Sequence, residues 1–416
     1  MNTRTNWAAL AGMALILAIP VARGQVSSNS SLTGKYFFRH VLFATSGSGS
    51  LTDARSASGT LTFDGNGGFT FTAQQIAGTT AAAPLAGSGS YTVKPGGFVT
   101  LTNPQKSGVT INARLGAQGL IGSSTESGTT LFDLLVAIPA SAQTMSAKSL
   151  SGTYYVSILE FPNATSGLAR DAFFPMASDG NGNFGSPNVT GDALNLNSKV
   201  TSQIVTGVTY AVSGDGSGTI TFPIPSSGDV TSQLVGGAKS IYVSQDGSMF
   251  IGGSLASGGH GLMIGVKAYA NNATNASWTG FYWGAGLRMD SNGFEAFSGS
   301  ANSTGAGSVV WYRRLVLGAA VEDFTPVHNY NLTPDGSGTA LGADVALAAT
   351  GNAFVGSGVQ PGDSAAYEIY FGIRMPAQSG TGVFLNPQGI FNAASFAPAG
   401  NPVSPGEFVT LYGSGF

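Results

Sequence analysis

The sequence predicts an all-β protein made of three tandem antiparallel meander modules, each a small barrel or a two-sheet sandwich. Glycine contributes 62 of the 416 residues and charged residues only 9%, a composition with many turns and few helix formers. Val, Ile, Phe and Tyr alternate with small polar residues over short segments, as they do in half-buried strands. A phrase that occurs three times indicates that one module was duplicated in tandem.

The repeated phrase has a small polar start followed by glycine and aromatic residues, and it reads SLTGKYFF at 31–38, SLSGTYYV at 149–156 and SWTGFYW at 277–283. Its glycines lie 118 and 128 residues apart, at Gly34, Gly152 and Gly280. A later tyrosine recurs at intervals of 119 and 120 residues, at Tyr91, Tyr210 and Tyr330. Two independent landmarks keep nearly one period, which predicts modules at residues 25–147, 148–275 and 276–378.

Residues 1–24 have the pattern of a secretory signal peptide. Arg4 precedes an apolar run from Ala8 to Ile19, and a small-residue end follows Pro20. Removing this segment takes away two arginines and no acids, so the formal charge changes from -3 to -5. The sequence contains no cysteine, which excludes disulfide bonds. We expect a secreted or cell-envelope bacterial protein with no membrane span after signal cleavage and no nucleic-acid partner.

Each module is expected to run through hairpins whose turns are rich in Asp, Asn and Gly. In module one, strands are expected at 34–43, 60–63, 69–71, 89–93, 98–101, 109–115, 119–122 and 131–138, with the turn DGNGG at 64–68. Module two repeats this order with turns at 179–183, 215–218 and 246–248, and module three has turns at 290–293 and 335–338. Without disulfides, each module is expected to depend on its own hydrophobic core.

Closure into an up-and-down barrel would remove both edge strands of such a meander, whereas a sandwich would protect them less completely. This argument favours the barrel. The glycine-x-aromatic first strand followed by a plain meander also resembles the small barrels of lipocalins and avidin. Barrel and sandwich both remain open at this point.

Residues 379–416 differ from the modules and are expected to form a linker and the start of a truncated immunoglobulin-like domain. Residues 392–396 (NAASF) lead through Pro405 and Gly406 into a strand that ends at 413–415 (GSG). Residues 386–416 resemble the start of an uncharacterised C-terminal domain family of secreted acidobacterial proteins, which is similar to TIG domains. The resemblance implies an exported, surface-associated protein and no catalytic residues. A complete sandwich of this kind needs about 80 to 100 residues.

No motif in the sequence predicts catalysis, a cofactor or a metal site. There is no Gly-x-Ser-x-Gly, and the histidines fall at unmatched places in the modules, at His40, His260 and His328. The acids that a glycosidase would need are scattered, at Glu160, Glu295, Glu322, Asp323 and Glu368. Asp64 and Asp179 lie in turns that supply one carboxylate each, so capping of the turn explains them better than calcium does.

Aromatic residues of the repeated phrase are the candidate binding residues. Tyr36, Tyr154 and Tyr282 occupy one equivalent position, and Trp283 follows the last of them. In open-mouthed barrels these rings could line an apolar or sugar-binding cavity, or they could fill the interior. Residues 311–314 (WYRR) predict an amphipathic strand with a solvated basic end.

Two functions are compatible with these features. The leading expectation is an exported non-enzymatic bacterial protein of structural or adhesive type, such as a stalk, with a cell-surface or extracellular glycan or protein as its partner. The alternative is a small-molecule or carbohydrate-binding protein that holds its ligand inside the β modules.

Overall fold

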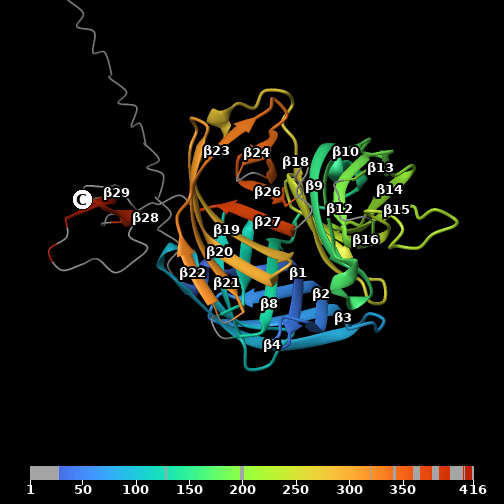
Figure 1. Cartoon of the computed structure of the whole chain (residues 1–416), viewed down its shortest axis with the longest axis horizontal. Helices are drawn as coiled ribbons and strands as arrows, with labels where there is room; N and C mark the ends of the chain where they lie inside the picture. The colour runs from blue at the N-terminus through green and yellow to red at the C-terminus, as the bar shows by residue number, and fades with distance from the viewer. Residues whose placement is uncertain are drawn as a thin grey trace, which may run out of the picture.

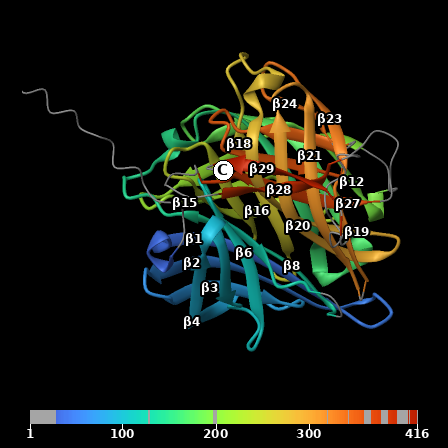
Figure 2. The ribbon, with the colours of Figure 1, turned by 90° about the vertical axis from the view of Figure 1, so that its left-hand side faces the viewer.

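The computed structural model describes residues 28–126, 129–196, 201–318, 320–340, 343–358, 366–376, 384–393, 406 and 408–414. In these ranges the chain forms antiparallel strands and short 3-10 turns, which confirms the predicted all-β class. The predicted signal peptide lies outside the described residues. Three sheets, blue, green and orange in Figure 1, surround a common centre, and the side view in Figure 2 again places the first sheet lowest.

The first sheet is a closed barrel of eight strands in sequence order, in which β8 returns to pair with β1. Its strands are β1 (Thr33–Thr45), β2 (Leu51–Asp64), β3 (Gly68–Ala77), β4 (Ala83–Lys94), β5 (Phe98–Thr102), β6 (Thr110–Gly116), β7 (Gly119–Ser123) and β8 (Leu131–Pro139). At the β2–β3 turn, Asp64 Oδ1 accepts hydrogen bonds from the amides of Asn66, Gly67 and Gly68. The Asp-Gly turn is therefore capped locally, as the sequence predicted.

The second sheet is open and has ten strands, in the order β11-β14-β15-β16-β17-β18-β9-β10-β12-β13. Its strands are β9 (Gly152–Phe161), β10 (Arg170–Ser178), β11 (Asn183–Gly185), β12 (Asn188–Ala193), β13 (Thr201–Ile204), β14 (Val208–Val212), β15 (Ser217–Phe222), β16 (Gly237–Val243), β17 (Met249–Ser254) and β18 (His260–Lys267). This sheet forms a half-barrel, so closure holds for two of the three modules.

The third sheet closes into an eight-stranded barrel because β20 pairs with both β19 and β21, and β22 is attached to β21 as a hairpin. Its strands are β19 (Thr279–Asp290), β20 (Gly293–Thr304), β21 (Ser308–Leu317), β22 (Ala320–Phe324), β23 (Val327–Leu332), β24 (Ser337–Ala340), β25 (Ala343–Leu347), β26 (Ala353–Ser357) and β27 (Tyr367–Arg374). A separate two-stranded antiparallel sheet pairs β28 (Phe384–Asn392) with β29 (Val409–Ser414).

The described helices are 3-10 turns: η1 (Asn29–Ser31), η2 (Pro95–Gly97), η3 (Ala147–Leu150), η4 (Pro162–Ala164), η5 (Ser166–Leu168), η6 (Leu194–Leu196) and η7 (Asn275–Ser277). In the part of the chain that the structure covers, none of these is long and apolar enough to cross a membrane.

The repeated phrase forms the same structure at one end of each sheet, a 3-10 turn (η1, η3 or η7) followed by the repeated glycine. We call this structure the plug. The turns η1, η3 and η7 are followed by its glycines, which have φ values of 88°, 98° and 87°. Glycine adopts this left-handed conformation without strain. The tyrosine landmark holds the plug, since the hydroxyls of Tyr91, Tyr210 and Tyr330 donate to carbonyls of residues 32, 147 and 278 at 2.7, 3.0 and 2.9 Å. The repeated glycines and the repeated tyrosines therefore recur together because both stabilise the plug.

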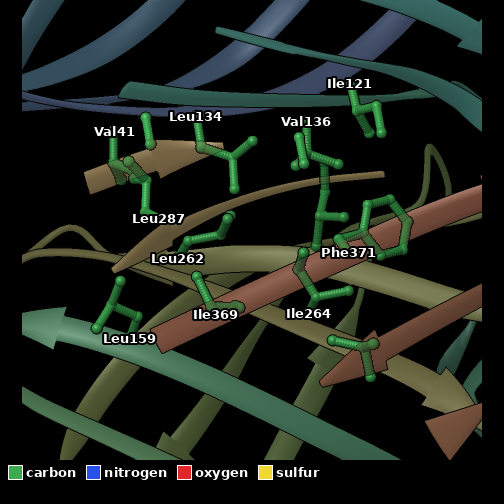
Figure 3. Close-up of a cluster of buried hydrophobic side chains, with 14 of the residues drawn as sticks. Val41, Ile121, Leu134, Val136, Leu159, Leu262, Ile264, Leu287, Ile369 and Phe371 are labelled. Carbon is green, nitrogen blue, oxygen red and sulfur yellow. The ribbon is translucent and has the colours of Figure 1, made fainter. Parts of the chain in front are cut away.

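The three sheets pack in a ring around one shared core. β1 packs against β17 and β18, β9 against β26 and β27, and β19 against β7 and β8. The first strand of each module thus contacts the last two strands of another, and the third module closes back on the first. Figure 3 shows the core at this centre, where Val41, Leu159 and Leu287, the seventh residues after the repeated glycines, pair with Leu134, Leu262 and Ile369. The expectation that each module depends only on its own core is wrong.

Candidate functional site

The four candidate binding residues are buried and do not form one site. Tyr36, Tyr154 and Tyr282 lie in the interiors of three different sheets, with exposed fractions of 8%, 0% and 0%. The hydroxyls of Tyr154 and Tyr282 donate to the carbonyls of Gly247 and Gly351, both at 2.6 Å. Burial raises the pKa of all three phenols.

Trp283 faces outward from its barrel, toward the first module. Its ring lies 5.3 Å from the ring of Phe98, and the Arg114 guanidinium lies 5.5 Å from its centre. Trp283 is therefore an interface residue of the shared core, and its surroundings differ from those of the three tyrosines.

A buried polar network lies inside the first barrel, at the end opposite the plug, which we call the barrel mouth. His40 Nε2 lies 2.8 Å from Asp133 Oδ2, and both side chains are fully buried. Asp133 also accepts hydrogen bonds from the hydroxyls of Ser123 and Ser124 at 2.7 and 2.8 Å. Burial alone would raise the pKa of Asp133, but these partners hold it below the ordinary value. The carboxylate is therefore ionised and satisfied by its neighbours.

The mouth of the second sheet holds a buried ion pair between Glu160 and Lys239. These two residues and His260 line a narrow cleft of about 40 Å³. His260 turns to the first barrel, with Nε2 2.7 Å from Gly78 O and Nδ1 3.3 Å from Ser56 Oγ. Burial lowers the pKa of His260 to about 4, so this imidazole is neutral at pH 7.

The mouth of the third barrel combines two arginines with two glutamates. Arg288 lies 3.8 Å from Glu295, and Arg313 lies 3.9 Å from Glu368. Burial raises the pKa of both glutamates. The Arg313 guanidinium is 3.8 Å from the centre of the Phe297 ring, and its side chain is 15% exposed, so the predicted solvated basic end is wrong for Arg313. It fits Arg314, whose side chain is 43% exposed.

The pairs in the first two mouths were missed because their members are far apart in the sequence. Glu160 and Lys239 are separated by 79 positions, and His40 and Asp133 by 93. The sequence did contain one sign of these pairs, the alternation of side chains along each strand. Each charged residue falls on the same strand face as apolar residues of the interior. Glu160 shares a face with Ile158, and Asp133 shares a face with Leu135. Charged residues on an inward face predict a buried pair, but they do not identify the partner.

A neutral cleft opens between the first and third modules, near one end of the shared core. We call it the axial cleft; its volume is about 370 Å³, and it is lined by residues 45–49, Thr129, Thr130, Phe132, Asn292, Phe294, Leu317 and Gly318. Beneath it, the Phe294 ring lies 5.1 Å from the ring of Phe43 and 5.3 Å from that of Phe161. All three modules thus contribute aromatic rings to the wall behind this cleft.

Within the described ranges, no three His, Cys, Asp or Glu side chains are grouped so that they could hold a metal ion. Asp179 is occupied by its own turn, since Oδ1 accepts from the amides of Asn181 and Asn183 at 2.7 and 3.0 Å. Its hydrogen bonds, first that from the Asn183 side chain, lower the pKa of Asp179. This matches the turn-capping role predicted for Asp64 and Asp179.

Comparison with known proteins does not assign a family. No protein-family model and no curated protein matches the chain. Among solved structures, a DUF3598-family protein of unknown function from Nostoc punctiforme aligns with 56% of this chain and 94% of its own, at 9% identity and a TM-score of 0.18. The H. pylori beta clamp in complex with diflunisal aligns with 81% of this chain and 91% of its own, at 8% identity and a TM-score of 0.11.

Proposed function

We propose that this protein is an exported, non-enzymatic β scaffold of structural or adhesive type, acting at the bacterial cell surface or in the medium. The observation that carries the proposal is the shared core, in which β1, β9 and β19 each pack against another module. Such a core fixes three modules in one body, which suits display of a broad outer surface. Export is supported by the signal-peptide pattern of residues 1–24. It is also supported by the resemblance of residues 386–416 to the C-terminal domain family of secreted acidobacterial proteins.

The ionisable groups support a non-enzymatic role. Asp133 is paired with His40 and Glu160 with Lys239, so neither carboxylate is free to act as a general acid or base. Glu295 and Glu368 have raised pKa values, but each faces an arginine, Arg288 or Arg313. Glu295 and Glu368 are therefore the carboxylic acids at which a test for acid catalysis is made.

The alternative function, a ligand held inside the β modules, has less support. The interior of the first barrel is packed with residues such as Leu61, Phe63 and Tyr91, and that of the third with Trp278, Trp311 and Phe354. Tyr36 and Tyr282 belong to this packing and Tyr154 to the core of the second sheet, so a ligand would have to displace packed side chains.

The test combines adhesion with turnover. Purified full chain is mixed with insoluble polysaccharides and with peptidoglycan, and the bound fraction and released sugar are measured. We expect saturable retention on at least one matrix and no product above the blank. Release of product that is abolished by Glu295→Gln or Glu368→Gln would overturn the non-enzymatic assignment, and absence of retention on every matrix would contradict the adhesive role.

A further inference from the structure

We propose that the axial cleft binds a neutral carbohydrate unit, a binding activity that goes beyond the scaffold role. The cleft lies where the β1–β2 turn of the first module meets the β19–β20 turn of the third. Gly49 and Gly293 approach closely there, since a Cβ placed on Gly293 would lie 4.0 Å from Gly49 O. The site therefore exists only when modules one and three are assembled.

The lining has the chemistry of a sugar site. Neutral hydrogen-bonding side chains form the rim, and they are Thr45, Ser46, Ser48, Thr129, Thr130 and Asn292. The apolar part comes from Phe132, Phe294 and Leu317. None of the described lining residues carries a charge. Hydroxyls and an amide can both donate and accept hydrogen bonds, while the apolar side chains of the lining suit the C–H face of a sugar ring.

The size of the cleft agrees with this ligand class. Pockets for small molecules commonly have volumes of about 300 to 1,000 Å³, and the axial cleft, at about 370 Å³, falls at the lower end. A monosaccharide or disaccharide matches this space better than a long chain does. A charged ligand is disfavoured, because the lining offers no opposite charge to replace the water that it would lose.

The walls of the cleft are held in place before any ligand arrives. The Thr45 amide donates to Thr130 O at 2.8 Å, and the Gly49 amide donates to Ser46 O at 2.9 Å. On the other wall, the Asn292 amide donates to Asp290 Oδ1 at 2.7 Å. Ordered turns reduce the conformational entropy that binding would otherwise cost.

The Asp-x-Asn-Gly turns give a matched pair of variants. Asn292 and Asn66 are both exposed, and the main-chain amide of each is capped by the aspartate two residues earlier, at 2.7 Å in both turns. Asn292→Asp places a negative charge in the axial cleft, whereas Asn66→Asp places the same charge on a turn outside it. Thr130→Trp fills the cleft from its exposed rim, and Thr70→Trp on the outside of β3 is its control.

The experiment measures binding of the full chain by saturation-transfer NMR and calorimetry. The probes are glucose, galactose, mannose, N-acetylglucosamine, cellobiose and maltose, with glucuronate and glucosamine as charged counterparts. We expect saturable binding of at least one neutral sugar, weakened at least tenfold by Asn292→Asp and by Thr130→Trp but unchanged by the two control variants. Circular dichroism confirms that each variant is folded.

Two results would overturn the proposal. One is an absence of saturation with every neutral probe up to about 10 mM. The other is binding that Asn292→Asp and Thr130→Trp leave unchanged, because the sugar would then bind elsewhere. Neither result bears on the scaffold role, which the retention assay tests independently.

Discussion

The carboxylates of Asp171 and Asp335 lie in surroundings that shift their pKa values in opposite directions. Asp171 is buried between the second and third sheets, where Oδ2 accepts from Ser357 Oγ and the Glu368 amide at 3.1 Å, and Oδ1 has no hydrogen bond within the described structure. Burial raises its pKa well above the ordinary value. For Asp335, hydrogen bonds from residues 333, 155 and 337 outweigh burial and lower the pKa to about 2.

These opposite shifts predict opposite effects of the same substitution. The raised pKa of Asp171 means that the folded state loses stability as pH rises and this group is forced to ionise. Asp171→Asn should therefore stabilise the protein increasingly from pH 5 to pH 8, by about 1 kcal/mol at the upper end. Urea unfolding at a series of pH values measures the difference.

Asp335→Asn is the matched comparison. The ionised Asp335 carboxylate stabilises the folded state above its unfolded pKa of about 4, and this contribution is lost as pH falls toward about 2. The variant should therefore unfold at lower urea than the unmodified protein at pH 7, with the difference shrinking in acid. A shift of both variants in the same direction at pH 7 would contradict this account.

At the scale of the element, the first strand of each module uses two neighbouring aromatic positions for different tasks. Tyr36, Tyr154 and Tyr282 face the interior, and the next residue faces another module. The outward contacts are Phe37 stacked on Tyr242 at 4.4 Å, Tyr155 donating to Asp335 Oδ2 at 2.5 Å, and Trp283 against Phe98 at 5.3 Å. One strand therefore packs its own module and attaches it to a second.

The inward hydroxyls give an element-scale prediction. Tyr154 fastens β9 to the β16–β17 hairpin end, through Gly247 O at 2.6 Å. The Tyr36 hydroxyl has no hydrogen-bond partner among the described residues, although its side chain, at 8% exposed, is also buried. Tyr154→Phe should lower the free energy of unfolding by about 1 kcal/mol or more, because it leaves a buried carbonyl unpaired. Tyr36→Phe should change it much less, and equal losses in urea titrations would refute the comparison.

Sequence patterns predicted the strands well because alternation and turn chemistry are local. The β2–β3 turn, for example, depends only on Asp64 and the amides that follow it. The outward packing of β1 had a visible signal too, since Phe37, Val41 and Phe43 alternate with the equally apolar Phe38 and Leu42. A strand that is apolar on both faces is buried on both faces. That signal predicts a second packing partner without identifying it.

At the scale of the whole molecule, the repeat predicted three copies but left their arrangement open. A chain of independent modules and a closed ring contain the same local patterns, and they differ only in which outward faces meet. The contact that closes the ring, β19 against β7 and β8, joins segments that lie far apart in sequence. Charge pairs such as Glu160 with Lys239 were out of reach for the same reason. Long-range pairing is decided by the summed packing of many residues, which no local motif encodes.

A closed ring predicts that module one stays in place when its covalent link is cut. The linker after β8 is exposed at Ala142, Gln143 and Thr144, so a protease site can be inserted there without disturbing a strand. Module one contacts both others, through β1 on β17 and β18 and through β7 and β8 on β19. After cleavage, the two fragments should elute together in size exclusion at low micromolar concentration, because the shared apolar core holds them. If the fragments separate without denaturant, the modules are joined mainly by their linkers and the shared core contributes little.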